Sequence, residues 1–402
     1  MPPRPSSPIN SAFSFSKRIY WSTEENILTQ KISDLKKAGI QLLDLTVSNP
    51  TLCDFNYLNQ DLLQPFLNAK NLVYDPEPHG LLESREALCA YYADLGIQIH
   101  PSQIFLTANT SEAYAFIFRL LCEPHESILA PEPSYPILEY LSSINDLRLL
   151  RYPLTYAKKW AIDLETIADY YHQGPKATLV VHPNNPTGNY INEEERLLLD
   201  KLNRSINSAI ISDEVFYPFS LESKVAQPTS FASNREVLTF TLGGISKFLG
   251  LPQMKLSWVI VSGPKDLRKQ AIERLEIVSD TFLSAGTPAQ TALPQWLQQG
   301  AAIQGEITER IRGNYDHLKN KLARETHLQL MVSEGGWNAV IRCPSSRSDE
   351  AWALSLLDHQ HVVTHPGYLF DFTQGAYLVV SLLVKSEIFQ EGIRKITEGI
   401  TP

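Results

Sequence analysis

The chain has 402 residues, of which 43% are hydrophobic, so it is long enough for two domains and a substantial core. A formal net charge of −9 without a basic run argues against nucleic acid and against an anionic membrane surface as partners. The apolar runs are far shorter than the ~20 residues of a membrane span, and no N-terminal stretch has the pattern of a secretory signal. The four cysteines lack metal or redox spacing, which favours reduced thiols in a cytoplasmic protein.

Strand-like and helix-like segments alternate through the middle of the chain, which predicts an α/β fold with a parallel sheet. The first eight residues are expected to form a tail. A helix is expected at 113–121, because Asn109 and Glu112 form a capping-box pattern before its apolar run. Strands are predicted at 104–107, 128–130, 178–182, 208–212, 238–242, 257–262, 336–341 and 377–381.

The pattern changes near both ends of the chain, which predicts a second and smaller domain. Residues 46–285 are expected to form a large three-layer domain around a mostly parallel central sheet. Residues 1–45 and 286–402 are expected to form a smaller α/β domain, built from both chain ends.

Three of the predicted strands are each followed closely by a polar side chain that could bind or react with a ligand. Residues 178–182 lead to Asn185, residues 208–212 to Asp213, and the strand before Gly243 and Gly244 to Lys247. In an open parallel α/β sheet, ligands bind outside the carboxyl ends of the strands. Pyridoxal phosphate needs a lysine for its Schiff base and an acid opposite its ring nitrogen, so this set favours that cofactor.

Each of these residues also has an ordinary structural reading. Asp213 would serve as a helix N-cap, and Asn185 would serve as a turn residue between prolines. Lys247 would be a surface lysine, but its place after a buried strand argues against this. The cofactor reading therefore depends on the three residues occurring together.

Four short motifs together resemble the class I/II aminotransferases, which are fold type I pyridoxal phosphate-dependent enzymes. They are Asn185-Pro-Thr-Gly188, Ser212-Asp213-Glu-Val215, Ser246-Lys247 followed eight residues later by Lys255, and Tyr74 before Gly80. Each motif alone is weak, but their order and spacing extend over nearly the whole chain. The resemblance implies a homodimer that exchanges an amino group between an L-amino acid and a 2-oxo acid by a ping-pong mechanism.

The resemblance also implies roles for individual residues. Lys247 would hold the cofactor and move the proton at the substrate Cα. Asp213 would pair with the pyridinium nitrogen, and Asn185 would donate to the phenolic oxygen. The remaining cofactor contacts would come from Asn109, Thr110, Ser111 and Ser246 near the phosphate, Lys255 as its cation, Tyr135 stacked on the ring, and Tyr74 of the neighbouring subunit.

The chain departs from the family pattern at several cofactor positions. Lys255 stands where an arginine is usual, so the charge is kept but the bidentate fork is lost. Phe216 stands where many members have a tyrosine, and Tyr217 follows it. Gly244 replaces a frequent hydroxyl residue, and Ser246 is expected to take over part of its work.

The largest departure concerns the substrate carboxylate. Val379 occupies the position of the arginine that binds this group in the family. Valine cannot replace a guanidinium, so Arg18 or Arg342 is expected to bind the carboxylate instead. If neither does, the expectation shifts to Asn185 and the backbone near Ser48.

Three functions remain open from the sequence. The first is an aminotransferase, the second a lyase or decarboxylase on the same scaffold, and the third a non-catalytic relative. The intact Asn185, Asp213 and Lys247 argue against the third, whereas Val379 keeps the second open. A metal site is not expected, because the histidines at 359, 361 and 365 lack partner ligands elsewhere.

Overall fold

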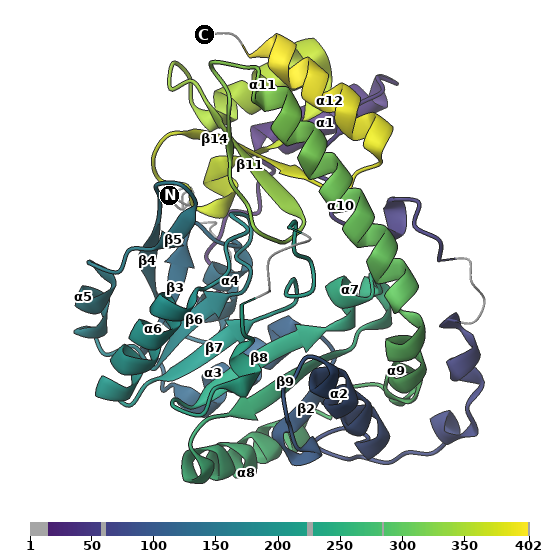
Figure 1. The fold of residues 1–402 in the computed structure, drawn as a ribbon, viewed down its shortest axis with the longest axis vertical. Coiled ribbons are helices and arrows are strands. Elements are labelled where there is room, and N and C mark those ends of the chain that lie inside the picture. Colours follow the sequence, from purple (N-terminus) through teal and green to yellow (C-terminus); the bar gives the residue numbers. More distant parts are fainter. Residues whose placement is uncertain (1–14, 58–61, 223–227, 284, 401–402) are drawn as a thin grey trace.

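The computed structural model describes residues 15–57, 62–222, 228–283 and 285–400 (Figure 1). The expected tail at residues 1–8 lies outside this part of the chain. Within the described residues, no helix combines the length and the apolar character needed to cross a bilayer.

The large domain is organised around an eight-stranded sheet with the order β2-β9-β8-β7-β6-β3-β4-β5. From β4 through β3, β6 and β7 to β8 the neighbours are parallel, whereas β9 is antiparallel to both β8 and β2, and β5 is antiparallel to β4. This confirms the predicted mostly parallel central sheet. The strands are β2 (Ile104–Thr107), β3 (Ser127–Glu132), β4 (Arg148–Tyr156), β5 (Trp160–Ile162), β6 (Ala177–Val181), β7 (Ala209–Asp213), β8 (Thr239–Gly244) and β9 (Ser257–Ser262).

Alternate residues along the central strands face opposite layers, as the two-residue period of a strand requires. Leu179 and Ile211 pack into a core shared with α3 and α8, whereas Val180 and Ile210 face a second core on the other side. Both faces of the central sheet are covered, and for this reason its strands are continuous apolar runs in the sequence. The helices of this domain are α2 (Leu82–Asp94), α3 (Thr110–Leu121), α4 (Ile137–Ile144), α5 (Ile167–Tyr171), α6 (Glu193–Ser205), α7 (Ile245–Phe248) and α8 (Lys265–Phe282).

The sequence did not predict β4 and β5, which form one edge of this sheet. Strand β4 contains Arg148 and Arg151 and has an irregular burial pattern, so it lacks both a clean alternation and a continuous apolar run. A mixed pattern of this kind is expected near the edge of a sheet, where β4 is paired with the short β5 only at residues 154–156.

The smaller domain contains a four-stranded sheet in the order β10-β11-β14-β13, all antiparallel, and it uses both ends of the chain. A separate pair joins β1 (Leu43–Asp44) in parallel to β12 (Val362–Val363), which brings the N-terminal segment next to the C-terminal one (Figure 1). The other elements are β10 (Gln329–Met331), β11 (Asn338–Cys343), β13 (His365–Pro366), β14 (Ala376–Ser381), α1 (Ile27–Lys37), α10 (Ala301–Leu322), α11 (Asp349–Gln360) and α12 (Ser386–Gly399). Helix α9 (Thr287–Gln299) packs on α2, beside the large sheet (Figure 1).

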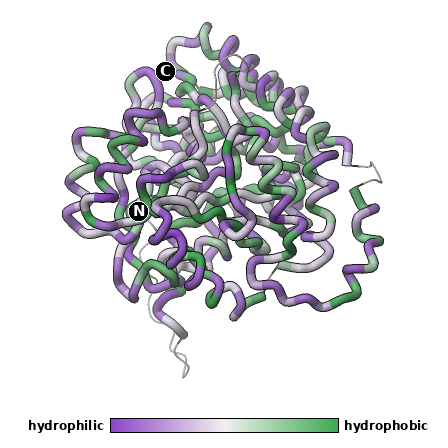
Figure 2. The backbone as a smooth tube through the Cα atoms, turned by 60° about the horizontal axis from the view of Figure 1, so that its bottom comes forward, coloured by the Kyte–Doolittle hydropathy of each residue, from purple (hydrophilic) through white to green (hydrophobic). Residues whose placement is uncertain are grey.

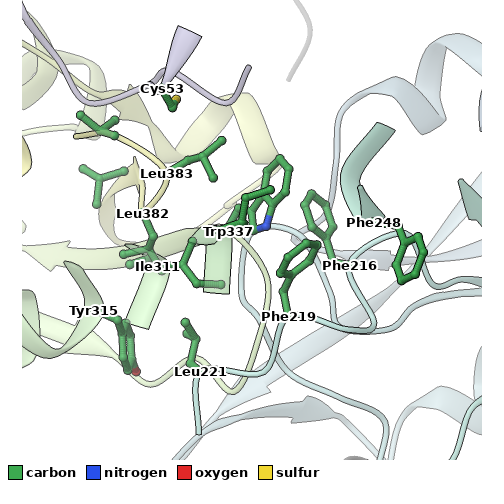
Figure 3. Close-up of a cluster of buried hydrophobic side chains, with 14 of the residues drawn as sticks. Cys53, Phe216, Phe219, Leu221, Phe248, Ile311, Tyr315, Trp337, Leu382 and Leu383 are labelled. Carbon is green, nitrogen blue, oxygen red and sulfur yellow. The ribbon is translucent and has the colours of Figure 1, made fainter. Parts of the chain in front are cut away.

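An aromatic cluster joins the two sheets beside the carboxyl ends of the parallel strands. Trp337, just before β11, makes edge-to-face contacts with Phe216 at 5.4 Å and Phe219 at 5.2 Å between ring centroids (Figure 3). Both phenylalanines follow β7 in the large domain. Because edge-to-face pairs add about 0.5–1.5 kcal/mol to the burial of the rings, this cluster fixes the small domain against the end of the large sheet.

Candidate active site

A cavity of about 550 Å³ lies at the carboxyl ends of the parallel strands. Its lining includes Val181, Asp213 and Gly244, which are the last residues of the adjacent strands β6, β7 and β8. The small domain closes the opposite side with Trp337, Asn338 and His365. The cavity therefore occupies the position at which open α/β sheets bind ligands.

Lys247 enters this cavity from α7, three residues after the end of β8. Its Nζ lies 5.1 Å from the ring centroid of Trp337 and 5.8 Å from that of Phe216. Burial lowers the pKa of the Lys247 amine, and nearby Asp213 partly offsets this effect. A lysine whose charged form is destabilised by desolvation is a better nucleophile near neutral pH.

Asp213 is held in a defined orientation at the end of β7. One carboxylate oxygen accepts a hydrogen bond from the Tyr114 hydroxyl at 2.8 Å, and the other accepts from the Val215 backbone N–H at 3.2 Å. Burial raises the pKa of Asp213, while these two hydrogen bonds and Lys247 act in the opposite direction. A cationic ligand atom beside this carboxylate would compensate its desolvation.

Asn185 belongs to a loop that is clamped against the small domain. Its Oδ1 accepts a hydrogen bond from Asn338 Nδ2 at 2.7 Å, which leaves the Asn185 Nδ2 group for a ligand. At the end of the loop, Gly188 has φ +73°, and a Cβ there would lie 2.6 Å from the Gly335 carbonyl oxygen. Only glycine therefore permits this close approach.

The first turn of α3 forms a cradle suited to an anion. Asn109 caps the helix by accepting from the Glu112 N–H at 2.9 Å, and Thr110 and Ser111 follow in the cavity wall. The free N–H groups of such a turn and the helix dipole favour a phosphate. Elsewhere in the lining, a Cβ at Gly244 would lie 2.4 Å from Ser257 Oγ, so a larger residue there would need the Ser257 hydroxyl to turn away.

The structure places the other expected cofactor residues in two groups. Ser246 and Tyr135 line the cavity, with Tyr135 46% exposed. Lys255 is exposed, has φ +54°, and does not line the cavity. Tyr74 is 80% exposed and also lies outside the lining. In the described chain, the contacts of Lys255 and Tyr74 with a cofactor therefore stay predictions.

Neither arginine expected at the substrate carboxylate lines the cavity. Arg18 forms an exposed ion pair with Asp146 on the surface. Arg342 lies on β11 opposite Gln329 and Tyr377, with its side chain exposed to solvent. Their contacts with a substrate carboxylate therefore stay predictions. Ser48, the alternative position, does line the cavity.

Two further departures from the family pattern can be placed. Phe216 lines the cavity, whereas the adjacent Tyr217 donates its hydroxyl to the Pro228 carbonyl oxygen at 3.0 Å and does not line it. Val379 is fully buried on β14, paired with His365 of β13 and Val340 of β11. Tyr217 therefore does not replace the missing tyrosine in this structure.

The sequence did not single out Tyr114, Trp337 and Asn338. Tyr114 occurs in the apolar run of α3, where the pattern predicts that an aromatic side chain packs in the hydrophobic core. Trp337 and Asn338 are far along the chain from the cofactor motifs, and only domain packing brings them to Lys247 and Asn185. Among the described residues, no group of three or more His, Cys, Asp or Glu side chains is arranged to hold a metal ion.

The buried carboxyl of Glu214, next to Asp213, has a raised pKa that should make the stability of the protein depend on pH. Burial raises the pKa of Glu214 to about 7, against hydrogen bonds from Ser230 Oγ, Ser212 Oγ and the Phe231 N–H that act to lower it. Because the folded pKa lies above the ordinary value of 4.5, the folded state binds this proton more tightly. The resulting stabilisation is present below pH 4.5 and is lost as the pH rises through about 7.

We therefore expect Glu214→Gln to remove this pH dependence. Relative to the variant, the wild type should lose about 3 kcal/mol of unfolding free energy between about pH 4 and about pH 8. Urea unfolding at the two pH values measures this difference. A constant difference between the two proteins would contradict a raised pKa for Glu214. Glu236→Gln, at an exposed position, is the matched control.

Comparisons with known proteins bear on this cavity. The model of the family described as "Aminotransferase class I and II" matches residues 45–393. "Glutamate-pyruvate aminotransferase AlaA" of Haemophilus influenzae is 24% identical over 375 residues, which cover 91% of this chain and 92% of that protein. "S-alkyl-thiohydroximate lyase SUR1" of Arabidopsis thaliana is 30% identical over 249 residues, or 61% of this chain, and the chain spans only 51% of its length.

The solved structures agree with the fold. The alanine aminotransferase from Pyrococcus furiosus superposes with a TM-score of 0.86 at 22% identity and covers 96% of this chain and 99% of its own. At that level of identity the likeness establishes the shared architecture. The chemistry must be argued from the side chains in the cavity.

Proposed function

We propose that this chain, which belongs to the class I and II aminotransferase family, moves an amino group between an L-amino acid and a 2-oxo acid by a ping-pong mechanism. The family uses pyridoxal phosphate. The observation that supports the proposal most strongly is the enclosed Lys247 amine at the end of β8, with Asp213 at the end of the adjacent strand β7.

The residues in the cavity fit this cofactor. Lys247 would hold it covalently, Asp213 would face its ring nitrogen, and Asn109, Thr110 and Ser111 would receive its phosphate. When bound, pyridoxal phosphate supplies an electron-poor ring that stabilises negative charge at the substrate Cα. The Tyr114 hydroxyl fixes the Asp213 carboxylate, and the released Lys247 amine is the group in the cavity that can move the proton at Cα.

A half-reaction screen tests the proposed function. Single amino acids are added to the cofactor-loaded protein, and the visible absorbance of the bound cofactor is followed. We expect it to disappear with an amino donor and to return when a 2-oxo acid is added. If it never responds to any amino acid, the proposal is wrong.

A lyase or decarboxylase is the second candidate, and the 30% identity to a protein named as a lyase favours keeping it. The same stabilised charge at Cα can lead to elimination instead of transfer. The two reactions differ in their products. A lyase would release a fragment of the amino compound or carbon dioxide without needing a 2-oxo acid to restore the absorbance.

We also propose that the protein is a homodimer whose sites need both chains. An exposed apolar surface supports this proposal, since large contiguous patches of this kind mark interaction sites. It lies on the segment after residue 61, at the edge of the molecule in Figure 1, and Figure 2 shows hydrophobic stretches within it. The exposed side chains are Leu63, Leu67, Leu72, Val73 and Tyr74.

Hybrid dimers test this arrangement. Lys247→Ala chains and Tyr74→Phe chains, each inactive or nearly so, are mixed by denaturing and refolding them together. If Tyr74 serves the site of the neighbouring chain, hybrids contain one intact site, and up to about a quarter of the wild-type activity should return. No recovery, with dimers confirmed by sedimentation, would contradict a shared site.

Three further expectations stay proposals. The β1–β12 pair supports assigning residues 1–45 to the small domain with 286–402, and 46–285 to the cofactor-binding domain. In the described part of the chain all four cysteines are free thiols, which is compatible with the cytoplasm. The net charge of −9 favours small-molecule substrates over nucleic acid.

A further inference from the structure

The charges around the cavity give the first indication of the substrate. Among the described residues that line it, only Lys247 and His365 can carry a positive charge. Under the proposed function, Lys247 holds the cofactor, and its released amine acts on the Cα proton and not on a substrate carboxylate. Burial disfavours the charged form of His365 and lowers the pKa of its imidazole, against the opposing effect of Asp44, the charged group that faces it. The loaded cavity therefore offers no fixed cation from these residues.

The arginine behind the cavity wall is already paired. Arg151 of β4 donates to Asp371 at 2.7 Å and to Glu139 at 3.0 Å, and Glu132 lies 4.0 Å away. Glu139 and Asp371 are the sequence neighbours of Tyr140 and Phe370, which do line the cavity. Three carboxyl groups therefore surround this one guanidinium. A substrate carboxylate placed there would have to compete with them for Arg151.

The same wall is apolar on the side that faces the cavity. Ile137 and Tyr140 of α4 and the adjacent Leu369 and Phe370 contribute to it. Trp21 of the N-terminal segment packs on Tyr140, with 4.4 Å between ring centroids. An apolar side chain against such a surface gains roughly 1.5–3 kcal/mol from leaving water.

The polar groups at this end are neutral. Asn338 on β11 is bonded to Asn185, and Ser48 and Thr46 add hydroxyl groups. The Thr46 hydroxyl already donates to Asp44 at 2.5 Å. An amide pair can satisfy a hydroxyl, an amide or a carboxylate with neutral hydrogen bonds, which are each worth about 0.5–1.5 kcal/mol.

From these contacts we infer that the cavity takes an amino donor with an apolar or aromatic side chain and does not require its carboxylate. The apolar wall at Ile137, Tyr140, Leu369 and Phe370 provides the selectivity. The polar group on Cα meets the Asn185–Asn338 amide pair in place of a cation. This inference rests on the proposed function for the identity of the amino donor, but the binding preference belongs to the cavity itself.

Equilibrium binding of unreactive analogues tests the inference without turnover. Calorimetry on the cofactor-loaded protein compares 3-phenylpropan-1-ol, 3-phenylpropionate and succinate. A charge-assisted bond to a cation contributes about 1.5–3 kcal/mol, or at least roughly tenfold in Kd. We expect the phenyl alcohol and the phenyl acid to bind within tenfold of each other, and succinate to bind more weakly than both. An acid more than tenfold tighter than the alcohol, or succinate binding as tightly as either, overturns the inference.

A wall variant checks that the apolar contacts are responsible. Leu369→Ser should weaken both phenyl compounds by a similar factor, roughly tenfold, because one leucine contact is lost. Leu267→Ser, at an exposed leucine on α8, is the control and should change neither Kd. An unchanged affinity of Leu369→Ser for both phenyl compounds also overturns the inference.

Failure of the proposed function has a separate signature. If pyridoxal phosphate does not attach to Lys247, the proposed function fails. The three titrations are then repeated on Lys247→Met, which removes the remaining lysine charge from the cavity. In that protein too, Kd values for the phenyl alcohol and the phenyl acid within tenfold of each other support the inference, and an acid that binds more than tenfold tighter overturns it.

Discussion

Replacing Lys247 by alanine is expected to abolish covalent attachment of pyridoxal phosphate and to reduce turnover by at least about a thousandfold. The reason is that one amine has two roles. It is the nucleophile that attaches the cofactor, and it moves the Cα proton, and the loss of either role should lower the rate roughly a hundredfold or more. Borohydride reduction followed by peptide mass spectrometry measures the attachment, and a steady-state assay measures the turnover.

Two results would separate this role from a structural one. Lys201→Ala, at an exposed position on α6, should keep both attachment and turnover. The Lys247→Ala protein should still bind the cofactor non-covalently through the α3 cradle. A Lys247→Ala protein with wild-type turnover would rule out the proposed function.

Asp213→Asn is expected to have the second largest effect, a fall of roughly a hundredfold in the rate of the first half-reaction. The carboxylate would keep the cofactor ring nitrogen protonated by a charge-assisted hydrogen bond of about 1.5–3 kcal/mol, which asparagine cannot supply. Stopped-flow measurement of the absorbance change with a reactive amino donor gives this rate directly.

Tyr114→Phe serves as the graded comparison for Asp213. It removes the 2.8 Å hydrogen bond to the carboxylate but keeps the charge. A neutral-donor hydrogen bond contributes about 0.5–1.5 kcal/mol, so the rate should fall by roughly two- to tenfold. If Asp213→Asn is no slower than Tyr114→Phe, the charge of Asp213 is not used in the reaction.

The fold class was largely predictable because its determinants are local. Strands that are buried on both faces must be continuous apolar runs, and β6, β7, β8 and β9 are visible in the sequence for this reason. The direction of β9 was not predictable. Its apolar run is the same whether it lies parallel or antiparallel to β8, and only the connection decides.

The part of the site at the strand ends was also visible in the sequence. Lys247, Asp213 and Asn185 each follow a buried strand, and the carboxyl ends of parallel strands meet at one edge of a sheet. The order of strands along the chain therefore brings these residues near one another. The structure places all three around one cavity, and their chemical roles stay predictions until the variants are measured.

Tertiary structure alone decided the substrate end of the cavity. The substitution at Val379 led us to expect Arg18 or Arg342, because a missing cation suggests a replacement, and their contact with a substrate stays a prediction. Domain packing brings the neutral Asn338 into the cavity wall and leaves both arginines exposed to solvent. Contacts between segments more than 150 residues apart, such as Asn185 with Asn338, have no local signature, because they depend on how the two sheets pack against each other.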